Sequence, residues 1–232
     1  MKHAHSCLVL FSVILSVASM GCSQAQPVRF AAPTIPAGTW QGRGTYVACE
    51  AVREGEDDPS PRQRSQDGVY ETSLEITKRT LFGREAIGVE IVSKRGKIFD
   101  SDETETHLRM LLLRLEPMAH GSTLYALGHL EFDPKEPPDY QKHEARIRAR
   151  SNLPSASCVQ IGPDTCLQVH YFIPEGDNRW TFKDTFVFSG DDVLKSGSFA
   201  ATSEQVRDGD KTKHNLSEIY WVERLGKVKP QQ

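Results

Sequence analysis

Short segments of alternating apolar and polar residues follow one another along this 232-residue chain from residue 38 onward. One face of the segment "YETSLEIT", for example, carries Tyr70, Thr72, Leu74 and Ile76, while the other face is mostly polar. A period of two is typical of a β-strand that buries one of its faces. Turn sequences such as "SGDD" separate the segments, and the order of the segments is mostly that of hairpins. The pattern predicts an all-β, mainly antiparallel domain of nine or ten strands.

Some stretches depart from this alternation. Residues 106–116, "THLRMLLLRLE", are more uniformly apolar, and their neighbours favour a buried strand there over a short helix. Residues 52–67 and 133–143 are charged and contain proline, so we expect both to be loops. Two architectures fit the strand pattern, namely a closed or nearly closed barrel and an open β-sandwich.

The first strand, "GTWQGRGTY" (residues 38–46), is unusually rich in glycine. Strand alternation places Trp40, Gly42 and Gly44 on one face. Glycine weakens a strand, so its repeated use here needs a structural reason. Close packing of another backbone, or a sharp coil where a sheet closes on itself, would supply one.

The "GTW" opening resembles that of the lipocalin-like, or calycin, β-barrels. The resemblance implies that Trp40 lies at the closed end of a barrel, with a basic residue of the last strand over its ring. Arg224, in "YWVERL", is the basic residue that the resemblance points to. If the register of the last strand differs by one residue, Trp221 and Glu223 point inward instead. In an open β-sandwich, Trp40 would simply be a core residue.

The N-terminal segment is typical of an exported protein. Residues 7–20 form an uncharged apolar run after Lys2, too short to span a bilayer comfortably, and we expect residues 1–21 to be a signal peptide. The sequence "SMGC" resembles a bacterial lipobox, which implies that Cys22 is acylated. Cleavage before Gln26 is the alternative.

These boundaries predict a barrel domain that is anchored to a membrane through an N-terminal tether. Residues 22–37 would be a lipid-anchored tether, residues 38–226 the barrel domain and residues 227–232 a disordered tail. The protein would then be anchored to a bacterial membrane, facing the periplasm or the cell surface. With cleavage before Gln26, it would be a soluble periplasmic or secreted protein.

Cysteine spacing suggests one disulfide. Cys158 and Cys166 flank the turn sequence "GPD" at residues 162–164, and an exported location favours a bridge between them. That pairing leaves Cys49 free. Two free thiols at 158 and 166 are the alternative.

One aromatic segment suggests a binding site. The sequence "WTFKDTFVF" places five residues on one strand face, which are Trp180, Phe182, Asp184, Phe186 and Phe188. If that face lines a barrel, it forms an apolar pocket with one polar group, and the buried Asp184 requires a partner. A filled core, or a bulge that turns Asp184 outward, would also explain the pattern.

A second candidate is the basic stripe, which consists of Arg146, Arg148 and Arg150. Such a stripe suits an anionic head group or an acidic partner. It is also typical of a solvated edge strand, in which charges prevent unwanted pairing.

Composition and motifs limit the function classes. Lys and Arg total 28 against 31 Asp and Glu, so the chain lacks the basic excess of a general nucleic-acid binder. Catalytic, nucleotide and zinc-protease signatures are missing from the sequence, and we expect neither an enzyme nor a metal or cofactor site. The sequence favours a bacterial envelope lipoprotein that binds a small apolar or amphipathic ligand inside a β-barrel. The alternative is a structural or interaction lipoprotein with a filled core that acts through its loops or its basic edge strand.

Overall fold

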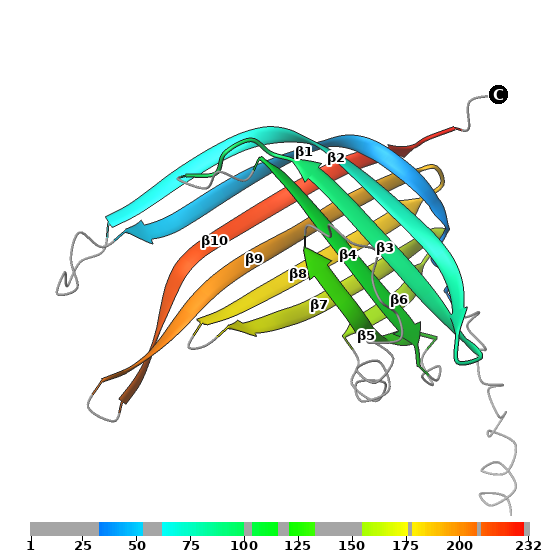
Figure 1. Ribbon diagram of the computed structural model, residues 1–232. Coiled ribbons are helices and arrows are strands. Elements are labelled where there is room, and N and C mark those ends of the chain that lie inside the picture. Colours follow the sequence, from blue (N-terminus) through cyan, green and yellow to red (C-terminus); the bar gives the residue numbers. More distant parts are fainter. Residues whose placement is uncertain are drawn as a thin grey trace, which may run out of the picture. The chain divides into compact units, whose positions relative to one another are not determined.

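The computed structural model describes residues 33–52, 62–99, 104–115, 121–132, 155–175, 178–207 and 210–229. Within these residues, ten β-strands form one antiparallel sheet (Figure 1). The strands are β1 (Gly38–Val52), β2 (Arg62–Leu81), β3 (Arg84–Lys94), β4 (Glu105–Arg114), β5 (Thr123–Phe132), β6 (Ala156–Ile161), β7 (Asp164–Glu175), β8 (Asn178–Ser189), β9 (Asp192–Arg207) and β10 (Asp210–Lys227).

Each strand pairs with the next strand along the chain, and β1 pairs with β10, so the sheet closes into a ring. This confirms the all-β, mainly antiparallel, closed or nearly closed barrel and excludes the open β-sandwich. Pairing is shortest between β5 and β6, where the register contains three residue pairs within the described strands. The ten described strands exceed the eight of a lipocalin barrel, so the likeness lies in the closed antiparallel ring.

Antiparallel order gives the barrel two distinct ends. At one end, the mouth, the strands β1, β3, β7 and β9 finish and the strands β2, β4, β8 and β10 begin. The opposite end, the floor, carries the β2–β3, β6–β7 and β8–β9 turns and the start of β1. The buried side chain of Ile35 also belongs to the core cluster that contains Trp40, and Thr34 accepts a hydrogen bond from Thr165. The segment before β1 therefore packs against the floor.

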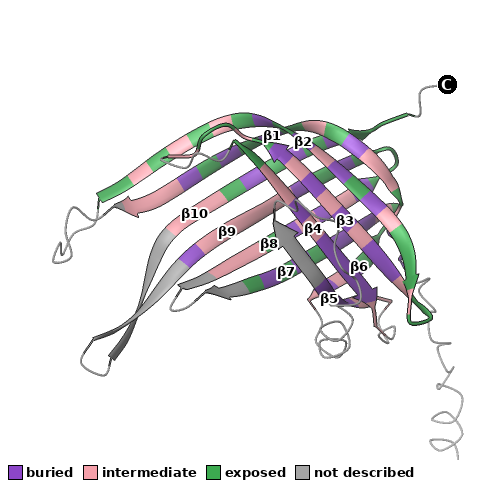
Figure 2. Ribbon diagram, in the orientation of Figure 1, coloured by how far each residue is buried: buried purple, intermediate pink, exposed green. Residues whose placement is uncertain are grey.

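Burial alternates along most strands, as the purple and green bands of Figure 2 show. The strand β4 differs because two of its outward residues, Leu111 and Leu113, are also buried, in a cluster with Ala86. Burial of both faces explains why "THLRMLLLRLE" lacks alternation, and it confirms that this segment is a strand.

The expected loop at residues 52–67 is strand at both of its ends, which corrects that part of the prediction. Val52 ends β1, and Arg62–Asp67 belong to β2, so only residues 53–61 lie outside the described residues. A polar side chain of this segment links two neighbouring strands, because Arg64 on β2 forms an ion pair with Glu50 on β1 at 2.6 Å. The other expected loop, residues 133–143, lies outside the described residues.

Gly42 is required by a close approach of two strands. A Cβ atom at Gly42 would overlap the backbone carbonyl oxygen of Arg224 on β10. The strand that closes the ring therefore packs directly against the position where a side chain would begin. This is the close backbone packing that the glycine-rich opening predicts.

Trp40 lies at the floor, but the predicted pairing with Arg224 is wrong. Trp40 is 1% exposed and meets Phe188 edge-on at 5.8 Å between ring centroids. Arg224 pairs with Arg43 on the outer face and is exposed, because Glu223 and Leu225 take the inward positions. The basic residue over the indole ring is Lys227, which pairs with Trp40 in the register and whose Nζ lies 5.9 Å from the ring centroid.

The predicted Cys158–Cys166 disulfide is not formed. The turn at residues 162–163 pairs Cys166 with Val159, and it pairs Cys158 with Leu167. Cys158 therefore points into the core, whereas Cys166 lies on the opposite face of the hairpin. Both are buried free thiols, and Cys49 is a half-buried free thiol.

These environments predict an order of thiol reactivity. Burial raises the pKa of Cys158 to about 12, and it also raises the pKa of Cys166. Because the thiolate is the nucleophile, we expect iodoacetamide at pH 8 to alkylate Cys49 first and Cys158 last. Time-resolved peptide mapping of the native protein measures this order. A cross-linked Cys158–Cys166 peptide, or equal rates at Cys49 and Cys158, would contradict the assignment.

Candidate ligand-binding site inside the barrel

A buried ionic cluster crosses the middle of the barrel. It consists of Asp184 on β8, Lys195 on β9 and Glu223 on β10, which are 2%, 3% and 1% exposed. Lys195 Nζ lies 2.9 Å from Glu223 Oε1 and 3.5 Å from Asp184 Oδ1. Buried charges are tolerated when they are paired and hydrogen-bonded, and this cluster meets both conditions.

Hydrogen bonds from neighbouring strands complete the cluster. Tyr70 donates its hydroxyl to Glu223 at 2.6 Å, and Thr72 donates to the other carboxylate oxygen at 3.3 Å. Trp221 donates its indole N–H to Asp184 at 3.1 Å. Both oxygens of the Glu223 carboxylate therefore accept hydrogen bonds, and Asp184 is contacted at its Oδ1 atom.

Two glycines allow these bonds to pass across an intervening strand. Gly44 lies between Tyr70 and Glu223 in the register, and a Cβ there would come within 2.6 Å of the Tyr70 ring and 2.8 Å of Glu223 Cγ. Gly197 lies between Asp184 and Trp221, and its Cβ would come within 2.6 Å of the carboxylate. The missing side chains give the space in which the polar cluster forms.

Burial in the cluster raises the pKa values of two of its members, Asp184 and Tyr70. Burial raises the pKa of Asp184, and its contact with Lys195 opposes that effect without cancelling it. Burial also raises the pKa of Tyr70 well above its usual value, and the charge of Glu223 adds to the rise. Burial therefore keeps Tyr70 protonated, as a hydrogen-bond donor to Glu223.

Aromatic side chains lead from the mouth toward this cluster. Trp180 meets Phe199 edge-on at 6.4 Å, Phe199 contacts Phe182 at 4.8 Å, and Phe182 stacks on Tyr171 at 4.7 Å between centroids. Trp180, Phe182 and Phe199 are only half-buried, although they lie on the inner face. Aromatic surface thus remains partly open at the mouth.

The β3–β4 connection packs over the same region. Ile98 and Phe99 pack against the mouth cluster that contains Tyr46, Tyr70 and Trp221. Gln66 holds this connection, because its side chain accepts a hydrogen bond from the Phe99 backbone N–H at 2.7 Å and donates to the Lys97 carbonyl at 2.8 Å.

Arg95 extends from this connection toward two aromatic rings. Its guanidinium carbon lies 5.7 Å from the centroid of Tyr70 and 5.9 Å from that of Trp221. Tyr70 and Trp221 also donate hydrogen bonds to the carboxylates of the ionic cluster, so Arg95 brings a second cation to the aromatic rings around the cluster.

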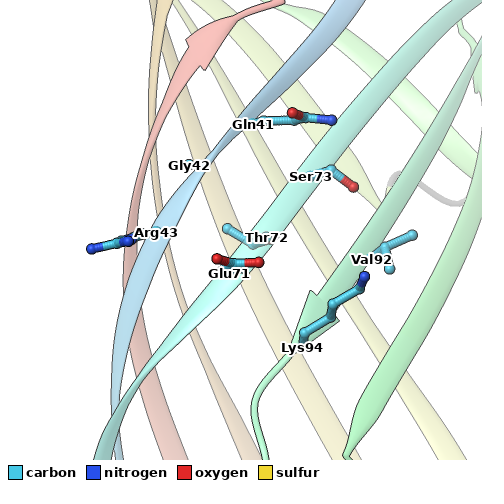
Figure 3. A pocket seen from close by; sticks show the side chains of 8 residues that line it. All are labelled: Gln41, Gly42, Arg43, Glu71, Thr72, Ser73, Val92 and Lys94. Carbon is cyan, nitrogen blue, oxygen red and sulfur yellow. The ribbon is translucent and has the colours of Figure 1, made fainter.

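Two grooves lie on the outer wall. The first, of about 430 Å³, is lined mainly by outward residues of β1, β2 and β3, and Figure 3 shows its open, mixed-charge surface with Arg43, Glu71 and Lys94 at one level of the register. The second, of about 480 Å³, runs over β1, β10, β9 and β8 beside the exposed side chains of Val47, Tyr220 and Val222.

The structure gathers the five residues of the aromatic strand as one inward face. Asp184, Phe186 and Phe188 are buried, whereas Trp180 and Phe182 are half-buried near the mouth. Asp184 finds the partners that its burial requires, namely Trp221 and Lys195. Whether this face binds a ligand stays a prediction.

Sequence reasoning missed the rest of the cluster. Lys195 shares a strand face with Val193 and Phe199, and a lysine on such an apolar face was the available signal. Glu223 was considered only as an alternative register, and Arg95 lies in a connection whose position no periodicity reveals.

Several predictions concern residues outside the described part of the chain. They are the acylation of Cys22, the preceding signal peptide, and the basic stripe of Arg146, Arg148 and Arg150. Among the described residues, no three His, Cys, Asp or Glu side chains are grouped to hold a metal ion. A membrane-spanning helix is not found in that part of the chain either.

The fold and the site together define an antiparallel β-barrel protein with a charged and aromatic interior. No protein-family model matches the chain, and no curated protein matches it.

Proposed function

We propose that the barrel binds a small amphipathic molecule that enters at the mouth. The observation that carries the proposal is the half-buried inward surface of Trp180, Phe182 and Phe199 beside a buried polar cluster. Ligand sites are typically apolar surfaces with a few fixed polar groups. Here the aromatic rings supply the apolar surface, and the groups around Asp184 and Lys195 supply the polarity.

The cellular setting belongs to the same proposal. Acylation at Cys22 would hold the barrel at a bacterial membrane, where amphipathic molecules are concentrated. In this view the protein is a cell-envelope lipoprotein, facing the periplasm or the cell surface, that acts by binding rather than by catalysis. A soluble exported form would use the same interior site.

A second candidate function is protein interaction through the outer wall. Val47, Val69, Tyr220 and Val222 are exposed on the neighbouring strands β2, β1 and β10, and three of them border the outer groove of about 480 Å³. Exposed apolar patches of this kind often mark interaction sites. The barrel would then have a filled core.

Fluorescence of N-phenyl-1-naphthylamine, a neutral apolar probe, distinguishes binding inside the barrel from binding in the outer groove. Ala201 lies on the inner face opposite Trp180, so Ala201→Trp is expected to fill the mouth and to reduce probe affinity at least about tenfold. Titration of purified protein, with circular dichroism to check folding, measures the effect.

The matched control places the same side chain on the outer wall. Ser198→Trp lies on the same strand, in the outer groove, and we expect probe affinity within about twofold of the original protein. Loss of binding in Ser198→Trp with normal binding in Ala201→Trp would favour the outer-wall function. Absence of binding by the original protein would refute the interior site.

A further inference from the structure

Two buried hydrogen-bond donors near the ionic cluster have no partner among the described residues. Tyr171 is 4% exposed and points to the inner face, yet its hydroxyl has no hydrogen-bond partner among the described residues. Arg95 Nε is likewise buried without a partner. Buried polar groups are normally paired, so two unpaired donors beside one site point to a ligand that accepts hydrogen bonds.

Three of the four carboxylate oxygens of the cluster, namely both of Glu223 and Oδ1 of Asp184, already face donors of the protein. Glu223 accepts from Tyr70, Thr72 and Lys195, and Asp184 accepts from Trp221 and faces Lys195. A donor-rich ligand such as an amine would therefore find few free acceptors in the cluster. A ligand oxygen, in contrast, would satisfy Tyr171 and Arg95.

Tyr171 and Arg95 both lie near the charged cluster. The Tyr171 phenol ring stacks on Phe182, next to Asp184 along β8, while Arg95 reaches Trp221, which bonds Asp184. The pKa of Tyr171 is raised by burial and by the charge of Asp184, and the charge of Arg95 partly opposes the rise. The Tyr171 hydroxyl is thus close enough to be influenced by the charges of both Asp184 and Arg95.

We propose that the ligand is an aromatic carboxylic acid whose carboxylate binds Tyr171 and Arg95 and whose ring packs on Phe182 and Phe199. This inference rests on the proposed function and specifies the ligand class for the same interior site. The ring fits the chain of stacked and tilted aromatic contacts that reaches Tyr171 from the mouth. Lys195 is already paired with Glu223 and Asp184, so Arg95 is the cation that remains for the carboxylate of the ligand.

Calorimetric titration with two probes of opposite charge tests the ligand class. We expect 2-naphthoic acid to bind at least about tenfold more tightly than 2-naphthylmethylamine, because a carboxylate accepts hydrogen bonds from Tyr171 and Arg95 whereas an ammonium group only donates them. Two variants test the residues. Tyr171→Phe removes only the hydroxyl, Arg95→Met removes the cation, and each is expected to weaken acid binding about tenfold.

Tyr171→Phe also has a signature that a structural role would not give. It deletes a buried hydroxyl without a partner, so the thermal midpoint of the free protein should stay equal or rise while acid affinity falls. The matched control is Tyr220→Phe, which removes the hydroxyl of an exposed tyrosine on the outer wall and should leave acid affinity unchanged.

The outcomes separate this inference from the proposed function. If N-phenyl-1-naphthylamine binds inside the barrel but the amine matches or exceeds the acid, the ligand class is wrong and the interior site remains. Acid binding that neither Tyr171→Phe nor Arg95→Met weakens would overturn the residue assignment. If neither naphthalene probe nor the neutral probe binds, both proposals fail.

Discussion

Lys195→Met is expected to lower the free energy of unfolding by about 3–5 kcal/mol at pH 7. The substitution leaves the carboxylates of Asp184 and Glu223 buried without the cation that contacts both of them. Removing one partner of a buried ion pair costs far more than removing an exposed charge, since the remaining charge has no water to solvate it. Urea denaturation followed by tryptophan fluorescence measures the change.

The loss should depend on pH in a defined direction. Burial raises the pKa of Asp184 above its ordinary value of 3.8, so its contribution to stability is present below that value and is lost as the pH rises through the folded-state pKa. Lys195 opposes that rise in pKa in the original protein. The variant should therefore recover stability relative to the original protein as the pH falls toward 4.

Two further variants serve as controls for this prediction. Lys183→Met removes an exposed lysine on β8 and should change stability by less than about 0.5 kcal/mol. Adding Asp184→Asn to Lys195→Met removes one of the two uncompensated charges and should restore part of the loss. A Lys195→Met protein as stable as Lys183→Met at pH 7 would show that the cluster is not buried as described.

Gly42→Ala is expected to destabilise the barrel by about 3 kcal/mol or more. Its new methyl group would overlap the carbonyl oxygen of Arg224, and a backbone atom cannot rotate away as a flexible side chain can. The β1 and β10 strands would have to separate at the seam where the ring closes. Thermal and urea unfolding, together with hydrogen exchange of the β1 and β10 amides, measure the effect.

Gly226→Ala is the matched control, because it makes the same change on β10 where the nearest atom to the new Cβ lies at 3.9 Å. We expect it to be neutral or slightly stabilising, since alanine is less flexible than glycine in the unfolded chain. Equal effects of the two substitutions would mean that the glycines act through strand propensity rather than through close packing.

Periodicity predicted the strands well, because a strand that buries one face has an apolar residue at every second position. The segment "YETSLEIT" lies within β2, and the turns at Gly162 and Gly190 lie where their sequences place them. The inward face of Trp180 to Phe188 was likewise readable from alternation. These features depend on local order along the chain.

The pairing register between strands could not be predicted from alternation in the same way. A shift of one residue exchanges the two faces of a strand, and this difference decided three outcomes. Lys227 rather than Arg224 covers Trp40, Glu223 rather than Arg224 points inward, and Cys158 and Cys166 lie on opposite faces. Each depends on which residue of a distant strand lies opposite, and alternation leaves that choice open.

The sequence by itself determined the fold class, the alternation of each strand and the glycine-rich first strand at which the ring closes. Only the tertiary structure decided which charges meet, because Asp184, Lys195, Glu223 and Tyr70 come from four strands and are brought together by ring closure. The hydrogen bond from Tyr70 to Glu223 passes over Gly44, and the bond from Trp221 to Asp184 passes over Gly197. The sequence alone does not show that these two glycines make room for the bonds. Strand faces follow from nearest neighbours in the chain, whereas the interior site follows from contacts between residues as far as 153 positions apart.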